Sequence, residues 1–367
     1  MFPDPTVLEE KDLQEGFRAA GRKGGRLKSK LSYYFEMGCK VRPLHAAPKV
    51  WNYVKYRSLA KAVQTSIRRY TPQIASVLVT KRCNLNCEYC FLRNIVNRQG
   101  AAWREDEATL DKIRRIFSNP LFDNCLLVDL QGGEPLLVDD LEAIVSYLVR
   151  RGHIVNTSTN GLLLAERIAG LKRAGISRIN VSLYDANREL IERGLAKINR
   201  VFPVHMSIVL LRSKLESDPD ELLRTACFLR AAGCLSLRFW MYRPLGADSR
   251  VHEIIDDALP AYLEFRRTMD QALPGFCLWP AAIQKAPFQK RCPQVWQRVG
   301  CDVAGNMAIC CGTDVTLQGP DSNLFDSNPD SVFNHPTLVA MREQLLDPGR
   351  DPPDICKTCN LLGEPGW

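Results

Sequence analysis

Three cysteines are the residues in this chain whose spacing points most directly to chemistry. Cys83, Cys87 and Cys90 lie in the run Thr80-Lys-Arg-Cys-Asn-Leu-Asn-Cys-Glu-Tyr-Cys-Phe91, with CxxxCxxC spacing. A [4Fe–4S] cube that only carries electrons takes one thiolate on each of its four irons. A local trio therefore implies either a distant fourth cysteine or an iron that accepts an exchangeable ligand. The alternatives are a zinc site or buried thiols.

A family resemblance gives the trio a more definite meaning. With the aromatic Tyr89 before its last cysteine, the run resembles the signature of the radical S-adenosylmethionine (SAM) superfamily. The resemblance implies a [4Fe–4S] cluster on three cysteines, with SAM on the open iron. The run Gln131-Gly-Gly-Glu-Pro135 resembles the GGE motif of the same enzymes. The carbonyls of Gly132 and Gly133, with the Glu134 carboxylate, would then accept hydrogen bonds from the SAM ammonium group, because glycine lets the backbone approach a ligand.

Polar residues at the ends of the following expected strands are weaker candidates. By resemblance, the ribose or the methionyl carboxylate of SAM would be bound by Thr157, Ser158, Thr159, Asn160 and Ser182, and the carboxylate would also pair with Arg212. Thr159 and Asn160 suit a helix N-cap equally well, and Ser182 suits local backbone capping. After the last strand come residues expected to orient polar or anionic substrate groups or, for the aromatic ones, to pack in the wall: Arg238, Trp240, Tyr242 and Arg243.

Six cysteines fall within the last 77 residues and indicate a second metal centre. Spacings of 18, 46 and 3 residues separate Cys292, Cys310, Cys356 and Cys359, which could supply all four thiolates of a closed [4Fe–4S] cluster. The segment resembles the SPASM and twitch extensions of radical SAM enzymes, especially the one-cluster twitch form of the aminocyclitol dehydrogenases. Structural zinc is the alternative.

Two further cysteines complicate this ligand set. Cys301 could replace Cys292 as a ligand or be a buried thiol. Neighbouring side chains on a strand point to opposite faces, so Cys310 and Cys311 should not both face one cluster easily. Ala304-Gly-Asn306 is expected to turn a hairpin between Val299–Val303 and Met307–Cys311.

The resemblance implies a radical SAM oxidoreductase, although no catalytic base can be named. SAM would be cleaved to a 5′-deoxyadenosyl radical that abstracts hydrogen from a small-molecule substrate, and the second cluster would accept the remaining electron. We expect a sugar or cyclitol substrate and a flavodoxin or ferredoxin as electron donor. One rival is epimerisation with a cysteine hydrogen donor, for which the unassigned thiols are Cys125, Cys227, Cys234, Cys277 and Cys311. Others are peptide maturation and a non-catalytic iron–sulfur or zinc module that binds nucleic acid.

The elements that must position these residues alternate between apolar strands and amphipathic helices from Ile74 onward, as in parallel βα units. The strands are expected at Ala75–Thr80, Leu126–Gln131, Ile154–Ser158, Arg178–Leu183, Val204–Leu210 and Ser236–Phe239, and the helices at Glu107–Phe117, Asp140–Arg151, Leu163–Ala174, Asn187–Asn199, Pro219–Ala232 and Pro260–Leu273. The pattern favours an α/β fold, a partial (β/α)6 TIM-like barrel with functional residues at the carboxyl ends of its strands.

Changes in composition divide the chain into four parts. Residues 1–71 form a basic, partly helical extension, 72–240 the radical SAM partial barrel, 241–290 a linker with a helix, and 291–367 a small α+β unit that binds the second cluster. The last part is expected to be a separate unit because its cysteine density is far above the chain average.

The basic excess of the chain is N-terminal, and residues 1–70 carry 15 Lys or Arg against 6 Asp or Glu. This segment could meet anionic lipid head groups, nucleic acid or an acidic partner protein, or be a solvated arm or helical lid. Apolar residues recur among these cations at helical spacing: Trp51, Val54, Leu59, Val63, Ile67 and Tyr70. We expect an amphipathic helix that packs on the core, with a position on a surface as the alternative. No apolar run is long enough for a transmembrane helix, and Met1–Glu10 does not resemble a signal peptide. We expect a cytoplasmic protein.

Overall fold

The computed structural model describes residues 43–62, 66–68, 70–88, 90, 92, 107–243, 250–256, 258–280, 292–313, 315–359 and 361–362. Most of the predicted basic extension lies outside these residues, as do residues 244–249, 257 and 281–290 of the predicted linker at 241–290. Among the described residues, nine strands form one sheet in the order β7-β6-β5-β4-β3-β2-β1-β8-β9.

The centre of this sheet consists of six parallel strands that follow one another along the chain. They are β1 (Ile74–Thr80), β2 (Leu127–Gly132), β3 (Ile154–Thr159), β4 (Arg178–Ser182), β5 (His205–Leu210) and β6 (Ser236–Met241). All six predicted strands are present, and their ends differ from the predicted ones by at most two residues. The agreement arises because these short apolar runs are buried on the helix-covered face of a parallel sheet.

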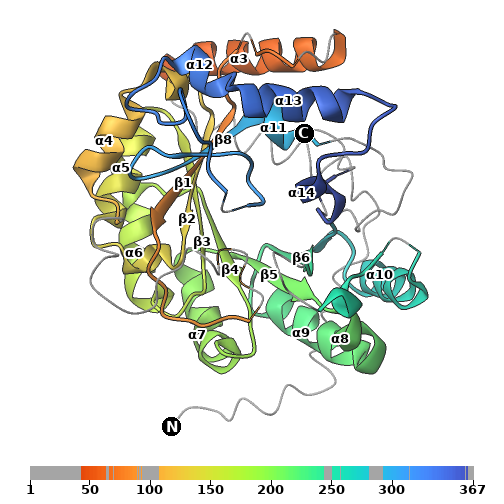
Figure 1. Cartoon of the computed structure of the whole chain (residues 1–367). Coiled ribbons are helices and arrows are strands. Elements are labelled where there is room, and N and C mark those ends of the chain that lie inside the picture. The colour runs from red at the N-terminus through yellow and green to blue at the C-terminus, as the bar shows by residue number, and fades with distance from the viewer. Residues whose placement is uncertain are drawn as a thin grey trace.

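Helices cover the outer face of the sheet, as Figure 1 shows. They are α4 (Leu110–Phe117), α5 (Leu141–Arg150), α6 (Leu164–Ala174), α7 (Arg188–Val201) and α9 (Pro219–Ala231). The predicted start of the first helix at Glu107 is wrong, because the Thr109 side chain accepts a hydrogen bond from the Lys112 backbone N–H and caps the helix there. The result is an α/β fold with a mostly parallel sheet. These helices do not cover the inner face of the sheet.

The C-terminal cysteine segment joins this sheet instead of standing apart from it. Strand β8 (Arg298–Asp302) pairs with β1 in parallel, and β9 (Met307–Ala308) pairs with β8 antiparallel. The predicted hairpin is present, with Gly305 at φ +85°, but its second strand is shorter than predicted. At the other edge, β7 (Cys277–Leu278) pairs with β6. The expectation of a separate unit overlooked the exposed edge of β1, whose backbone groups need a partner.

Shorter elements complete the described chain. These are α8 (Arg212–Ser217), α10 (Pro260–Ala272), α11 (Gln294–Gln297), α12 (Pro329–Phe333), α13 (Pro336–Leu346), α14 (Asp354–Lys357) and single turns at Pro120–Phe122, Pro135–Leu137 and Val251–Glu253. Helix α13 is fixed by Arg342, which is fully buried and donates hydrogen bonds to the carbonyls of Ser66, Val295 and Phe333.

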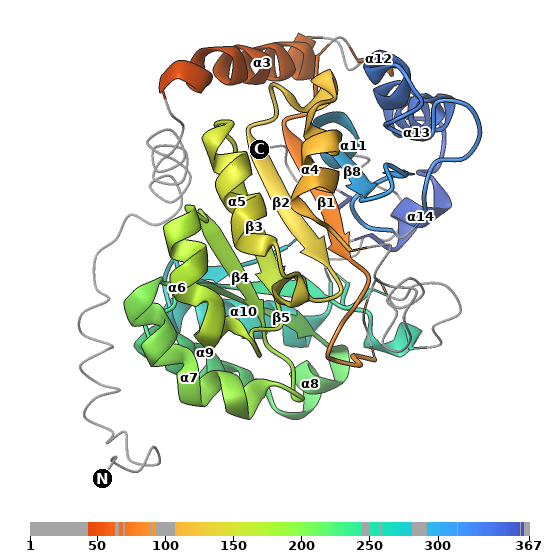
Figure 2. The same ribbon diagram turned by 90° about the vertical axis from the view of Figure 1, so that its left-hand side faces the viewer.

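Helix α3 (Pro43–Ala62) lies across the end of the sheet at which the strands begin (Figures 1 and 2). The predicted inward packing of the apolar stripe is wrong for Trp51, Val54 and Ile67, which are exposed, while Tyr70 is buried as expected. The buried side instead presents Lys49 and Asn52, which donate hydrogen bonds to the carbonyls of residues 123–125. Those carbonyls precede β2 and need donors, so the polar side of the helix faces inward. No helix in the described ranges is long and apolar enough to cross a bilayer.

Candidate active site

A cavity of about 520 Å³ lies against the inner face of the sheet. It extends from the carboxyl ends of the strands, where the Cys83–Cys90 loop lies, to the residues around Gln73 and Gln297 at their beginning. The predicted site residues that line it are Cys83, Cys87, Cys90, Gly132, Thr157, Ser158, Thr159, Asn160 and Ser182. The fold thus brings the trio together with the polar ends of β2, β3 and β4.

Gly132 and Gly133 allow the end of β2 to pack directly on the chain that leads into the cysteine trio. The backbone N–H groups of Gly133 and Glu134 donate to the carbonyls of Thr80 and Arg82, both at 2.8 Å. A Cβ atom on Gly133 would overlap the carbonyl group of Arg82. Glycine is therefore required here for contact with the chain itself, in addition to any ligand.

Glu134 is buried behind the cavity wall, with 1% of its surface exposed. Its carboxylate accepts hydrogen bonds from the Thr159 hydroxyl at 2.6 Å, the Asn160 backbone N–H at 2.7 Å and the Leu136 backbone N–H at 2.9 Å. Burial raises the pKa of Glu134, while these hydrogen bonds oppose the increase. In this arrangement Glu134 fixes the end of β3 beside the end of β2.

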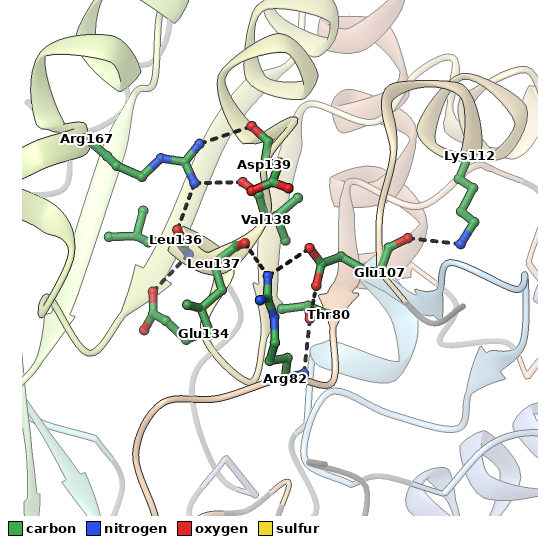
Figure 3. A network of polar contacts seen from close by, with 10 residues as sticks. All are labelled: Thr80, Arg82, Glu107, Lys112, Glu134, Leu136, Leu137, Val138, Asp139 and Arg167. Carbon is green, nitrogen blue, oxygen red and sulfur yellow. Dashed lines mark hydrogen bonds and ion pairs between the residues drawn. The ribbon is translucent and has the colours of Figure 1, made fainter. Parts of the chain in front are cut away.

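Two arginines that the sequence analysis did not single out hold the Gly-Gly-Glu-Pro turn from behind (Figure 3). Arg167 donates to the carbonyls of Leu136 and Val138, both at 2.7 Å. Arg82 donates to the carbonyl of Leu137 and pairs with Glu107 at 3.0 Å. These bonds satisfy the carbonyls of a tight turn and keep it rigid. The sequence gives little indication of these contacts, because each arginine lies on a different element from the turn.

Asn160 connects the end of β3 to the cysteine loop. Its side-chain amide donates to the Asn84 side chain at 2.7 Å, between Cys83 and Cys87 in the chain. Its backbone carbonyl accepts a hydrogen bond from Asn187 at 2.7 Å. The cysteine loop is thereby fixed to β1, β2 and β3 together.

The inner face of the sheet carries a set of polar side chains that the sequence analysis missed. Asp129, Asn156, Asn180 and Ser207 all line the cavity from consecutive strands. Asn156 donates to Asp129 at 3.4 Å, and Asn180 donates to Ser207 at 3.1 Å. Asp129, Asn180 and Ser207 each lie between two buried apolar neighbours, and Asn156 follows one, so period-two polarity inside apolar runs was the signal that could have found them.

The described part of the cavity wall has a positive balance of charge. Four arginines line it, Arg178, Arg238, Arg243 and Arg298, against one carboxylate, Asp129. Arg298 pairs with Asp129 at 2.6 Å. Trp240 and Tyr242 also line the cavity, and the Arg238 guanidinium lies 5.2 Å from the centre of the Trp240 ring. Such a wall favours polar, anionic groups and a planar group beside the aromatic rings.

Four predicted SAM-binding residues are not part of this wall as described. Gly133 and Glu134 do not line the cavity. Arg212 begins α8, is 43% exposed and pairs with Glu216 at 2.8 Å, and it does not line the cavity. Tyr89 lies outside the described residues.

Five C-terminal cysteines lie close enough together to affect one another. Burial raises the pKa of Cys292, and the neighbouring thiols of Cys311 and Cys359 raise it further. Burial likewise raises the pKa of Cys356 to about 12, with contributions from Cys310 and Cys359. The arrangement brings Cys310 and Cys311 into the same thiol group, which the alternation argument did not expect, because the described β9 ends at Ala308 and both cysteines follow it in a turn.

Arg243 holds this thiol group together. Its guanidinium donates to the carbonyl of Ile355 at 2.6 Å and to that of Gly312. These carbonyls lie next to Cys356 and Cys311 in the chain. A fixed positive charge therefore lies among thiols that would ionise on binding metal.

The remaining cysteines are placed apart from this group. Cys301 is buried on β8, and burial raises its pKa, with Asp302 and the thiol of Cys125 adding to the increase. Cys234 and Cys277 are also buried, while Cys227 is half-buried. Of the five cysteines that the sequence left unassigned, only Cys311 lines the described cavity.

Both thiol groups have the chemistry of iron–sulfur ligands, with several cysteines and few carboxylates nearby. Across the described ranges, no three His, Cys, Asp or Glu side chains converge as they would on one metal ion. A cubane cluster places each thiolate on a different iron, so its ligands surround a volume instead of a point. The thiol-rich donor set of each group fits such a cluster.

Comparison with known proteins agrees with this geometry. The family model of the radical SAM superfamily matches residues 77–226. GTP 3′,8-cyclase from Corynebacterium glutamicum (strain R) is 30% identical over 302 residues, covering 75% of this chain and 76% of that enzyme. GTP 3′,8-cyclase from Aquifex aeolicus is 30% identical over 192 residues, covering 47% of this chain and 58% of that enzyme, so the chain spans little more than half of its length.

The fold is also found in a solved structure. SuiB from Streptococcus suis, whose structure was determined with S-adenosylmethionine bound, superposes with a TM-score of 0.59 at 16% identity, covering 83% of this chain and 75% of that one. This likeness concerns the fold alone. Three observations assign the family: the matched family model, the cysteine trio beside the Gly-Gly-Glu turn, and the extent of the Corynebacterium match. The chain belongs to the radical SAM superfamily, whose enzymes use a [4Fe–4S] cluster together with S-adenosylmethionine.

Proposed function

We propose that this enzyme removes a hydrogen atom from a small, anionic substrate in the cavity and passes the remaining electron to a second iron–sulfur cluster. The observation that carries the proposal is a single cavity lined both by the Cys83, Cys87 and Cys90 trio and by Cys311 of the C-terminal thiol group. When bound, a reduced [4Fe–4S] cluster and SAM supply a 5′-deoxyadenosyl radical. The twitch-like or SPASM-like nature of the C-terminal segment belongs to this proposal.

The residues around the trio would hold SAM against the open iron. Gly132, Thr159, Asn160 and Ser182 line the cavity, and Glu134 holds Thr159 and Asn160 in place by hydrogen bonds. Their fixed positions would keep the sulfonium group and the substrate carbon in one orientation and exclude water. Tyr89 stays a proposed contact on its motif alone.

The second cluster would be held by Cys292, Cys310, Cys356 and Cys359, with Cys311 as a competing ligand. Four thiolates would close it to substrate, which suits electron transfer. The substrate would lose one hydrogen atom to the radical, one proton to solvent and one electron to this cluster. A sugar or cyclitol phosphate is a suitable substrate class, because its hydroxyl groups match the Asp129, Asn156 and Asn180 row.

A second candidate is the cyclisation of a purine nucleoside triphosphate. The C. glutamicum GTP 3′,8-cyclase favours it by sequence, and the four arginines of the cavity wall would suit a triphosphate. Trp240 and Tyr242 offer faces for a purine ring. This reaction rearranges the substrate without net loss of hydrogen, so product mass separates it from oxidation.

The decisive experiment is anaerobic reconstitution with iron and sulfide, followed by dithionite and SAM. We expect 5′-deoxyadenosine in the wild type and none in Cys87→Ala, whereas Cys301→Ala, a buried core thiol, should keep the activity. Myo-inositol 1-phosphate, glucose 6-phosphate and GTP would then be compared as probes. A product lighter by two hydrogen atoms supports oxidation, and an isomer of GTP supports cyclisation.

Two outcomes would contradict the proposal. Unchanged 5′-deoxyadenosine formation in Cys87→Ala would remove the trio from the reaction. Deuterium entering the product from heavy water without change in redox state would favour epimerisation, with Cys311 as the donor to test.

A further inference from the structure

Helix α3 exposes three apolar side chains on the side that faces away from the protein. Val50 is 56% exposed, Trp51 61% and Val54 42%, and one helical turn relates these positions. The side facing the protein carries Lys49, Asn52 and Tyr56, all buried. A globular protein normally buries the apolar side of such a helix. The stripe of Val50, Trp51 and Val54, named the α3 stripe below, therefore calls for a partner.

The polar side of α3 is fixed in place and cannot be exchanged for the apolar one. Lys49 donates to the carbonyls of Asp123 at 3.0 Å and Cys125 at 2.7 Å. Asn52 donates to the carbonyls of Thr71 and Asn124 at 3.1 and 3.3 Å. Rotating α3 about its axis to bury Trp51 would break all four bonds. The outward direction of the α3 stripe is thus a property of the fold.

The sequence of α3 is positively charged. Pro43–Ala62 holds four Lys or Arg and no acid. Within α3, the Lys55 ammonium lies 6.0 Å from the centre of the Trp51 ring. A protruding tryptophan with aliphatic neighbours and a lysine beside it matches helices that lie in a membrane interface. Nucleic acid would match the cations but gain nothing from exposed valines.

The position of α3 also suits a flat surface. The helix lies along the outer margin of the molecule in both Figure 1 and Figure 2, at the end of the sheet opposite the cysteine trio. Contact there would leave the carboxyl end of the strands open. Tyr53, on the inner side of the same helix, lines the cavity.

We infer that α3 docks this enzyme on an anionic lipid surface, with the α3 stripe in the acyl boundary and Lys55 beside it at the head groups. The inference is independent of the substrate. Both contributions are needed, since one helix with three apolar side chains gives only weak, reversible binding without charge attraction.

Vesicle flotation of the full-length protein tests this. We expect the wild type to float with vesicles of phosphatidylglycerol and phosphatidylcholine, and to bind pure phosphatidylcholine about tenfold or more weakly. Val50→Ser/Trp51→Ser/Val54→Ser should lose about tenfold in binding to the anionic vesicles. The matched control is Leu263→Ser on α10, since Leu263 is similarly exposed at 51% but stands alone among cations and acids.

Three results would overturn the inference. The first is wild-type protein that stays with the unbound fraction at low salt. The second is a triple variant that floats like the wild type although its circular dichroism and SAM cleavage are normal. The third is binding of the wild type to an RNA or DNA duplex that weakens in the triple variant as much as binding to vesicles does.

Discussion

The role of Glu134 can be tested by changing one atom of its carboxylate. In Glu134→Gln the side chain keeps its size but offers one carbonyl oxygen and one NH₂ group. One oxygen of Glu134 accepts from both Leu136 and Thr159, and the other accepts from the Asn160 backbone N–H alone. The glutamine should therefore place its oxygen at the first position and turn its NH₂ group toward Asn160.

The expected cost follows from this count. One hydrogen bond to a charged acceptor is lost, worth about 1.5–3 kcal/mol, and the Asn160 N–H faces another donor. Relief of the buried charge, which raises the pKa of Glu134, offsets part of the loss. We expect a net decrease of about 1–2 kcal/mol in the free energy of unfolding. Glu134→Ala loses all three bonds and should cost about 3–5 kcal/mol.

The assay pairs anaerobic denaturant unfolding with SAM binding by calorimetry. Because Asn160 lines the cavity and holds the cysteine loop through Asn84, SAM should bind Glu134→Gln more weakly, by at most about 30-fold if about 2 kcal/mol is lost entirely in the bound state. Glu216→Gln is the control, since Glu216 is half-exposed and pairs only at the surface. Wild-type stability together with wild-type SAM affinity in Glu134→Gln would refute the reasoning.

Three further changes have expected outcomes. Burial lowers the pKa of Lys49 from 10.5 to about 8, so the folded chain releases this proton first and stability rises with pH from about 8 to about 10.5. Measured by urea unfolding, the free energy of unfolding of the wild type should rise by about 3 kcal/mol relative to Lys49→Met over that pH window. The same pH dependence in both proteins would contradict the lowered pKa of Lys49. Arg342→Ala should lower the unfolding free energy by about 3 kcal/mol or more, since three carbonyls lose this donor and two of these bonds are buried, and a loss below about 1 kcal/mol would argue against this role. Reconstituted Cys359→Ser should fall from about eight to about four irons per chain, while Cys301→Ser keeps about eight; equal iron in both variants would remove the second cluster from the proposal.

The sequence predicted the strand and helix order of residues 74–241 well because each strand is a short apolar run and each helix has a clear apolar side. It also brought Cys83, Gly132 and Asn160 to one region, since carboxyl ends of parallel strands share an edge. Periodicity could not predict which part of the chain each side of a helix contacts. In the sequence, the apolar residues of α3 have the spacing of a core helix. Only the folded chain shows that Lys49 and Asn52 of this helix bond to the carbonyls of residues 123–125.

The candidate site shows the same limit. Motif spacing identified Glu134, but its three donors come from the end of β3 and the turn after β2, which only the folded chain brings together. Arg82, Arg167 and Arg243 hold backbone carbonyls and leave no pattern in the sequence. Cys310 and Cys311 were expected on opposite faces, and the short β9 removes the regular strand on which that expectation rested.

The parallel pairing of β8 with β1 limits how far the C-terminal segment can be treated as an interchangeable module. Five residues of β1, from Ile74 to Leu78, are matched with Arg298 to Asp302. A chain cut before residue 292 would leave this apolar strand as an unprotected sheet edge, open to pairing with another copy. Transplanting the segment onto another barrel, or removing it to isolate the cysteine trio, would therefore be expected to yield aggregates unless a substitute strand covers β1.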